Sequence, residues 1–128
     1  MPAAGKLSER ERTLNALMPV TPNPLGEVRL DAFTFYYGLE YLKRSKPRVM
    51  FLSFDETDDF AHGGEYAGYL NSAHAVDGFL KELWETIQSD PFYMNKTTLF
   101  ITVDHGRGNN TKEWKGHGKE IAGSDQIW

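Results

Sequence analysis

The feature that most constrains the fold is a pair of short apolar runs separated by a longer stretch of helical periodicity. The runs cover residues 48–54 (RVMFLSF) and 97–103 (TTLFITV). Apolar segments of this length, bounded by turn or acidic residues, indicate buried strands of a parallel sheet, and the second is also rich in β-branched residues. We therefore expect a strand–helix–strand unit with a right-handed crossover, which places the chain in the α/β class.

The stretch between the two predicted strands has the pattern of one long helix, from about residue 65 to residue 89. Asp90-Pro91 ends it, because proline cannot continue a helix. The apolar side chains recur at helical spacing and predict an inward face. This face consists of Tyr69, Ala73, Val76, Leu80, Leu83 and Ile87.

Two further helices are predicted before the first strand. Ser8 and Glu11 have the spacing of a capping box, in which a hydroxyl accepts a backbone N–H and a carboxylate reaches back. A helix is therefore expected over residues 8–18, followed by a proline-rich linker. Asp31 is a candidate N-cap for the second helix, whose apolar stripe consists of Phe35, Leu39 and Leu42.

These patterns divide the chain into N-terminal helices with a Pro-rich linker, residues 1–47, and a βαβ portion, residues 48–128. The last residues (SDQIW) have the pattern of a third strand at its beginning. Two strands and a stub make a poor sheet, since sheets usually have about four to six strands. We therefore expect the βαβ portion to be incomplete at both ends and the sequence to be part of a longer one.

The composition argues against several classes of function. A net charge of −4 and a pI near 5.5 argue against a nucleic-acid partner, which normally requires a basic patch. No apolar run approaches the roughly 18 residues of a membrane-spanning helix. The chain has no cysteine, so any metal site must use histidine, aspartate or glutamate side chains.

One candidate metal cluster directly follows the first predicted strand, in the stretch FDETDDFAHGG. Asp58 and His62 are four residues apart, so on a helix they share a face and can bind one ion. Asp55 and Glu56 are competing carboxylates on the same segment. The alternative is a helix N-terminus whose acids interact with the helix dipole and whose histidine merely faces solvent.

A second cluster follows the second predicted strand, in the stretch VDHGRGNNTKEWKGHG. Asp104 and His105 are adjacent, so both can reach one ion only in a turn, which Gly106 favours. His117 lies between two glycines, a setting that suits close approach to a charged group and equally suits a plain surface loop. Both clusters follow the C-terminal ends of predicted parallel strands, where open α/β sheets bind their ligands.

Together the two clusters offer five metal ligands, Asp58, His62, Asp104, His105 and His117. Zinc accepts this set of nitrogen and oxygen donors, and manganese or another divalent ion is also compatible with it. His74 falls within the predicted long helix and is interpreted as structural. Arg107 could bind an anionic substrate through two parallel hydrogen bonds, although a solvated loop arginine is the simpler interpretation.

The order of three motifs, FDETDDFAH, TVDHGRG and WKGHG, resembles the C-terminal metal-binding half of the alkaline phosphatase superfamily. That group includes phosphatases, nucleotide pyrophosphatase/phosphodiesterases, cofactor-independent phosphoglycerate mutases and sulfatases. The resemblance covers about residues 48–128 and implies a partial three-layer αβα fold with a mostly parallel sheet. It also implies two divalent metal ions, most simply zinc, one held by Asp58, His62 and His117 and the other by Asp104 and His105.

The function implied by this resemblance is hydrolysis of a phosphate monoester, phosphate diester or sulfate ester. Two metal ions would assist an in-line displacement by a Ser or Thr nucleophile. That nucleophile and one further Asp ligand are not found in this sequence, so no catalytic residue is assigned and the chain alone should be nearly inactive. The expected partner is a small-molecule ester. Many members are exported, so the resemblance also implies a periplasmic or secreted location.

Two alternatives belong to other classes. The missing nucleophile is compatible with a non-catalytic metal-binding or interaction module. A third interpretation is an α/β piece in which the histidines lie together by coincidence. Substrate, metal identity and oligomeric state do not follow from the sequence, because specificity in such folds depends on loops and insertions.

Overall fold

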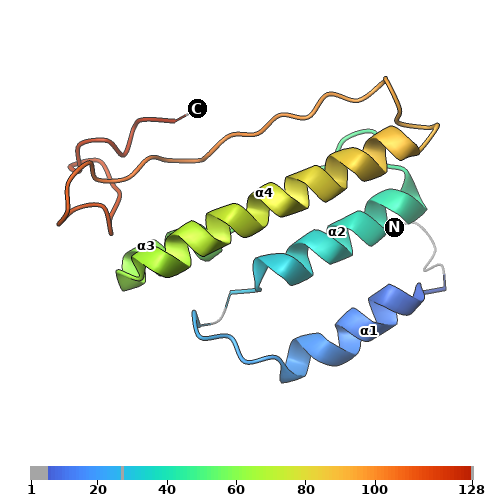
Figure 1. The fold of residues 1–128 in the computed structure, drawn as a ribbon, viewed down its shortest axis with the longest axis horizontal. Helices are drawn as coiled ribbons and strands as arrows, with labels where there is room; N and C mark the ends of the chain where they lie inside the picture. Colours follow the sequence, from blue (N-terminus) through green and yellow to red (C-terminus); the bar gives the residue numbers. More distant parts are fainter. Residues whose placement is uncertain (1–5, 27, 128) are drawn as a thin grey trace. The chain divides into compact units, whose positions relative to one another are not determined.

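The computed structural model describes residues 6–26 and 28–127. Within these ranges the elements follow in the order α1 (Glu9–Leu17), η1 (Met18–Val20), α2 (Asp31–Ser45), α3 (Glu56–Gly63) and α4 (Tyr66–Ser89) (Figure 1). The chain divides into two compact units, one ending at Asp55 and the other beginning at Glu56. Each unit is described by itself.

Helix α1 of the first unit begins at the predicted capping box. The Ser8 hydroxyl accepts a hydrogen bond from the Glu11 N–H at 3.0 Å, and the Ser8 N–H donates to the Glu11 carboxylate at 2.8 Å. These bonds satisfy backbone N–H groups that have no partner within the helix. The predicted capping box and the helix that follows it are therefore confirmed, with the helix running from Glu9 to Leu17.

Helix α2 supplies most of the core of the first unit. The predicted apolar stripe is confirmed, because Phe35, Leu39 and Leu42 are all buried. Asp31 has a different role from the predicted one: it is the first helical residue rather than the cap. Its buried carboxylate accepts a hydrogen bond from the Asp55 N–H at 2.8 Å. This bond holds the chain at Asp55 against the first turn of α2.

The predicted α/β class is wrong for the described part of the chain, which contains helices and no strand. Neither residues 48–54 nor residues 97–103 form a sheet ladder, so the three-layer αβα arrangement and its parallel sheet are absent from these residues. A strand requires hydrogen bonds to a neighbouring strand, and a local apolar pattern cannot supply that neighbour. Several of the apolar side chains are consequently exposed, among them Val49, Phe51 and Phe100.

The second unit is organised by α3 and by α4, its longest helix (Figure 1). The two helices approach closely, since a Cβ added at Gly68 would lie closer than 3.0 Å to the Phe60 ring. The predicted inward face of α4 is confirmed in its C-terminal half, where Leu83 and Ile87 are buried. In the N-terminal half Ala73 is exposed and Ser72 is buried instead.

None of the helices in the described ranges combines the length and the apolar character needed to cross a membrane. After α4 the chain continues without helix to the end of the described residues, through the extended stretch 97–103 and then through a series of turns.

Candidate metal centre

Helix α3 presents the first half of the candidate site. The predicted helical spacing places His62 one turn after Asp58, and the His62 Nε2 atom lies 3.2 Å from Asp58 Oδ2. Three acidic residues occupy the first turn of α3, where the helix dipole favours negative charge. Of the two competing carboxylates, Asp55 belongs to the first unit and Glu56 is the first residue of α3.

The second half comes from the segment that follows residue 103, which folds back on itself. The Gly106 N–H donates to the Ser124 carbonyl at 2.8 Å, and the Gly108 N–H donates to the Gly116 carbonyl at 3.1 Å. A Cβ at Gly106 would lie closer than 3.0 Å to the carbonyl oxygens of Gly123 and Gln126. Glycine is thus required here by close backbone packing, and its φ is not in the left-handed region that a sharp turn would use.

Trp114 anchors this segment to helix α4. Its ring meets Tyr66 edge-on at a centroid distance of 5.4 Å and Tyr69 at 6.0 Å. Such edge-to-face pairs are favourable because the positive edge of one ring faces the negative face of another. The contacts hold the backbone two residues before Gly116, and so position His117 against α3.

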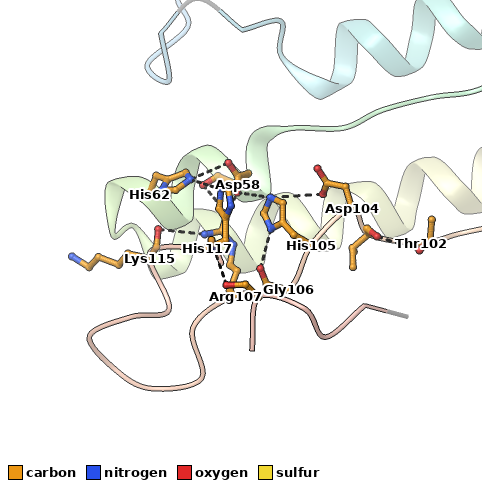
Figure 2. Close-up of polar contacts among 12 residues, drawn as sticks. Asp58, His62, Thr102, Asp104, His105, Gly106, Arg107, Lys115 and His117 are labelled. Carbon is orange, nitrogen blue, oxygen red and sulfur yellow. Dashed lines mark hydrogen bonds and ion pairs between the residues drawn. The ribbon is translucent and has the colours of Figure 1, made fainter. Parts of the chain in front are cut away.

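The two halves meet at Asp58 (Figure 2). His117 Nε2 lies 3.0 Å from His62 Nε2 and 3.6 Å from Asp58 Oδ1. His105 Nε2 lies 3.5 Å from the same carboxylate oxygen, and its ring stacks on that of His117 at 3.7 Å. Asp58, His105 and His117 each offer a ligand atom within 4.8 Å of the others.

The spacings of these atoms fit a zinc-like ion. Bonds of 2.0–2.1 Å at tetrahedral angles place neighbouring ligand atoms about 3.3 Å apart. His62 Nε2 lies 3.0 Å from His117 Nε2. The two histidines face different oxygens of Asp58, His62 Nε2 at 3.2 Å from Oδ2 and His117 Nε2 at 3.6 Å from Oδ1. The donor set of imidazole nitrogens and a carboxylate is also one that zinc accepts.

The orientation of His105 and the lowered pKa of His117 favour metal binding as well. The His105 Nδ1–H donates to the Gly106 carbonyl at 2.9 Å, because a carbonyl can only accept, and Nε2 is the nitrogen that faces Asp58. Burial, followed by the charges of His105, His62 and Arg107, holds the pKa of His117 below its usual range. The His117 ring is therefore neutral near pH 7 and can serve as a ligand.

Asp104 and His74 lie outside this group of converging ligands. The Asp104 side chain is 92% exposed, and its carboxylate is 3.8 Å from His105 Nε2. His74 is exposed on α4. The division of the five residues into two separate ion sites stays a prediction.

Arg107 is the residue whose role the sequence interpretation missed. Its side chain is 13% exposed, and burial lowers the pKa of the guanidinium, which stays protonated at neutral pH. Arg107 Nη2 forms an ion pair with Asp58 Oδ1 and donates to the Asp58 carbonyl at 3.2 Å. The flanking residues Gly106 and Gly108 indicate close backbone packing, but no local pattern in the sequence marks the Arg107 side chain as buried.

Comparison with known families agrees with this geometry. A family model described as the Metalloenzyme superfamily matches residues 34–121, which is more than half of the chain. This chain belongs to the Metalloenzyme superfamily. That family lies within the alkaline phosphatase-like superfamily, so the resemblance found in the sequence is confirmed. Membership of the Metalloenzyme superfamily indicates a metal-dependent enzyme that binds divalent ions. No curated protein and no solved structure gives a significant match.

Proposed function

We propose that this chain provides part of the metal centre of a metal-dependent hydrolase of phosphate or sulfate esters. The observation that carries the proposal is the convergence on Asp58 of histidines from two distant segments. His62 and His117 are 55 residues apart in sequence, yet their Nε2 atoms are 3.0 Å apart. Imidazoles gathered around one carboxylate are the pattern expected of metal ligands.

Asp58, His62 and His117 would hold one ion, and Asp104 with His105 would contribute to a second. Zinc suits this donor set, and manganese is the alternative. When bound, such ions stabilise the negative charge on the transferring group and on the attacking and leaving oxygens. The chain's own part is to fix the ligands: α3 sets the spacing of Asp58 and His62, and the Gly106 carbonyl orients the His105 ring.

The nucleophile belongs to the proposal but is not assigned to a residue of this chain. In a two-metal displacement of this kind, a deprotonated Ser or Thr hydroxyl would attack the phosphorus or sulfur atom and displace the ester oxygen, which leaves as an alcohol after taking up a proton. Water would then displace the Ser or Thr oxygen from the covalent intermediate. We therefore expect ion binding by this chain without appreciable ester hydrolysis. The substrate is a small molecule with a tetrahedral anionic centre.

The test is the metal content of the purified chain after zinc loading and desalting, measured by mass spectrometry. The comparison is with a His62→Ala/His117→Ala double variant and with His74→Ala, which removes an exposed histidine of α4. We expect at least one tightly held zinc ion in the wild type and in His74→Ala, and loss of that ion in the double variant. A wild-type chain that is folded by circular dichroism and holds no zinc would overturn the proposal.

A further inference from the structure

Arg107 lies inside the ligand cluster although it cannot bind a metal ion. Its Nη2 atom pairs with Asp58 Oδ1, the same oxygen that His105 Nε2 approaches to 3.5 Å and His117 Nε2 to 3.6 Å. Figure 2 shows these side chains meeting at one carboxylate. The Arg107 guanidinium and a metal ion would therefore bind the same atom, Asp58 Oδ1.

We propose that Arg107 is the counterion of Asp58 in the metal-free protein and competes with the incoming metal ion for that carboxylate. The inference rests on the metal site of the proposed function and adds to it a residue that sets metal affinity. Metal binding through Asp58 Oδ1 then replaces the guanidinium as the positive partner of that oxygen.

The burial of the pair explains why Asp58 needs such a partner. The Asp58 side chain is 28% exposed, and a carboxylate withdrawn from water is costly unless a positive group or hydrogen-bond donors compensate it. His105 Nδ1 bonds to the Gly106 carbonyl, and its Nε2 stays 3.5 Å from Asp58 Oδ1, beyond the length of a normal hydrogen bond. Of the described side chains that contact Asp58, Arg107 alone carries a permanent charge.

Two backbone contacts hold Arg107 in place independently of the carboxylate. Arg107 Nη2 donates to the Asp58 carbonyl at 3.2 Å, and Nη1 donates to the Lys115 carbonyl at 3.3 Å. The guanidinium can thus give up Asp58 Oδ1 and stay attached to both segments. Because Asp58 Oδ2 faces His62 at 3.2 Å, the competition acts on the side of the carboxylate that His105 and His117 share.

Zinc affinity, measured by competition with a chromophoric chelator, tests the inference. Arg107→Gln should bind zinc on the order of tenfold more tightly than the wild type, because a partly buried, charge-assisted pair no longer has to be broken. Lys115→Gln is the matched control, since it removes a positive side chain from the same loop without touching Asp58. We expect this control to stay within about threefold of the wild type, the size of a screened surface charge effect.

A double-variant cycle assigns the effect to Asp58. In an Asp58→Asn background the Arg107→Gln change should alter zinc affinity far less than in the wild type, because the shared carboxylate is gone. A gain in affinity of equal size in Lys115→Gln would overturn the inference, since general charge would then suffice. Equal or weaker zinc binding by Arg107→Gln would also overturn it while leaving the metal site intact. Absence of zinc binding by the folded wild-type chain would instead overturn the proposed function.

A measurement on the wild type covers the case in which Arg107→Gln does not fold. The guanidinium signals of Arg107 in a nitrogen-15 spectrum should shift when zinc is added, and their exchange with water should accelerate. Zinc binding that leaves these signals unchanged would contradict the exchange of one cation for the other.

Discussion

Asp58 is the residue on which the contacts of the candidate centre converge, and we expect it to be the most sensitive ligand. Asp58→Asn removes the negative charge that His62, His105 and His117 share while keeping the size of the side chain. Zinc affinity should fall by at least roughly 10–100-fold, because this loss is typical even when a residue that only hydrogen-bonds to a metal ligand is replaced. Equilibrium dialysis against zinc measures it, with the exposed Asp55 as the control position.

Comparison of the two variants also shows what would contradict this prediction. If Asp58→Asn and Asp55→Asn bound zinc equally well, Asp58 would be only a counterion of Arg107 and the ion would bind elsewhere. Circular dichroism of both variants excludes unfolding as the cause of any loss.

Gly106 gives a second prediction at the residue scale. A Cβ there would overlap the carbonyl oxygens of Gly123 and Gln126, and backbone atoms cannot move aside as a flexible side chain can. Gly106→Ala should destabilise the chain by about 1–3 kcal/mol, the usual cost of overpacking, and weaken zinc binding by displacing His105. Urea unfolding measures the free energy of unfolding.

The control for this change is Gly78→Ala, because an added Cβ at Gly78 in α4 meets nothing within 4 Å. That substitution should stabilise the helix by up to about 1 kcal/mol, since glycine loses more backbone entropy than alanine on folding. Equal effects of the two substitutions would show that the close approach at Gly106 does not constrain the loop.

The sequence predicted the ligands better than their surroundings. Asp58 and His62 could be paired because helical spacing is a local property, and their contact at 3.2 Å follows directly from it. The position of Arg107 could not be predicted in this way. Its burial depends on hydrogen bonds such as that from the Gly106 N–H to the Ser124 carbonyl, which join residues far enough apart that no spacing rule relates them.

At the scale of elements, the capping box of α1 makes its stability depend on pH. The hydrogen bond from the Ser8 N–H to the Glu11 carboxylate holds the pKa of Glu11 below its ordinary value of 4.5. Burial of the carboxylate opposes this shift, and the nearby Arg44 adds to it. A carboxylate with a lowered pKa in the folded state contributes stability above its unfolded pKa. That contribution is lost as the pH falls through the folded value.

We therefore expect Glu11→Gln to be less stable than the wild type at pH 7, with the difference shrinking as the pH falls below about 4.5. Urea unfolding at a series of pH values from neutral to acid measures the difference. Glu9→Gln, a change at an exposed residue of the same turn, should show a smaller dependence. A difference that stayed constant or grew in acid would mean that the ionised carboxylate of Glu11 does not stabilise α1.

Helices and strands differ in how far their sequence signals reach. The capping hydrogen bonds of α1 join residues three positions apart, and the buried residues of α2 recur every three or four positions. Local sequence patterns therefore predict both correctly. Residues 48–54 and 97–103 have strand composition, but their hydrogen bonds would have to come from other segments. The exposed side chains of Val49 and Phe100 show that composition alone does not produce a sheet.

At the scale of the whole molecule, the described ligands all belong to the unit that begins at Glu56. Membership of the Metalloenzyme superfamily indicates metal binding, and the distances around Asp58 indicate where the ion would bind. An ion there would connect α3 to the loop that carries His105 and His117. Its binding free energy would therefore stabilise one part of the chain selectively.

Hydrogen exchange with and without zinc tests this selectivity. At a zinc concentration 100 times the dissociation constant, the gain in stability of the binding unit should be about 2.7 kcal/mol. Amides of α3 and of residues 104–118 should exchange more slowly, while those of α1 and α2 serve as an internal control and should not change. The His62→Ala/His117→Ala variant should show no protection in either region. Protection spread equally over α1 and α2 would mean that zinc also binds, or acts through, the first unit, and the assignment of the metal centre to the second unit would then be wrong.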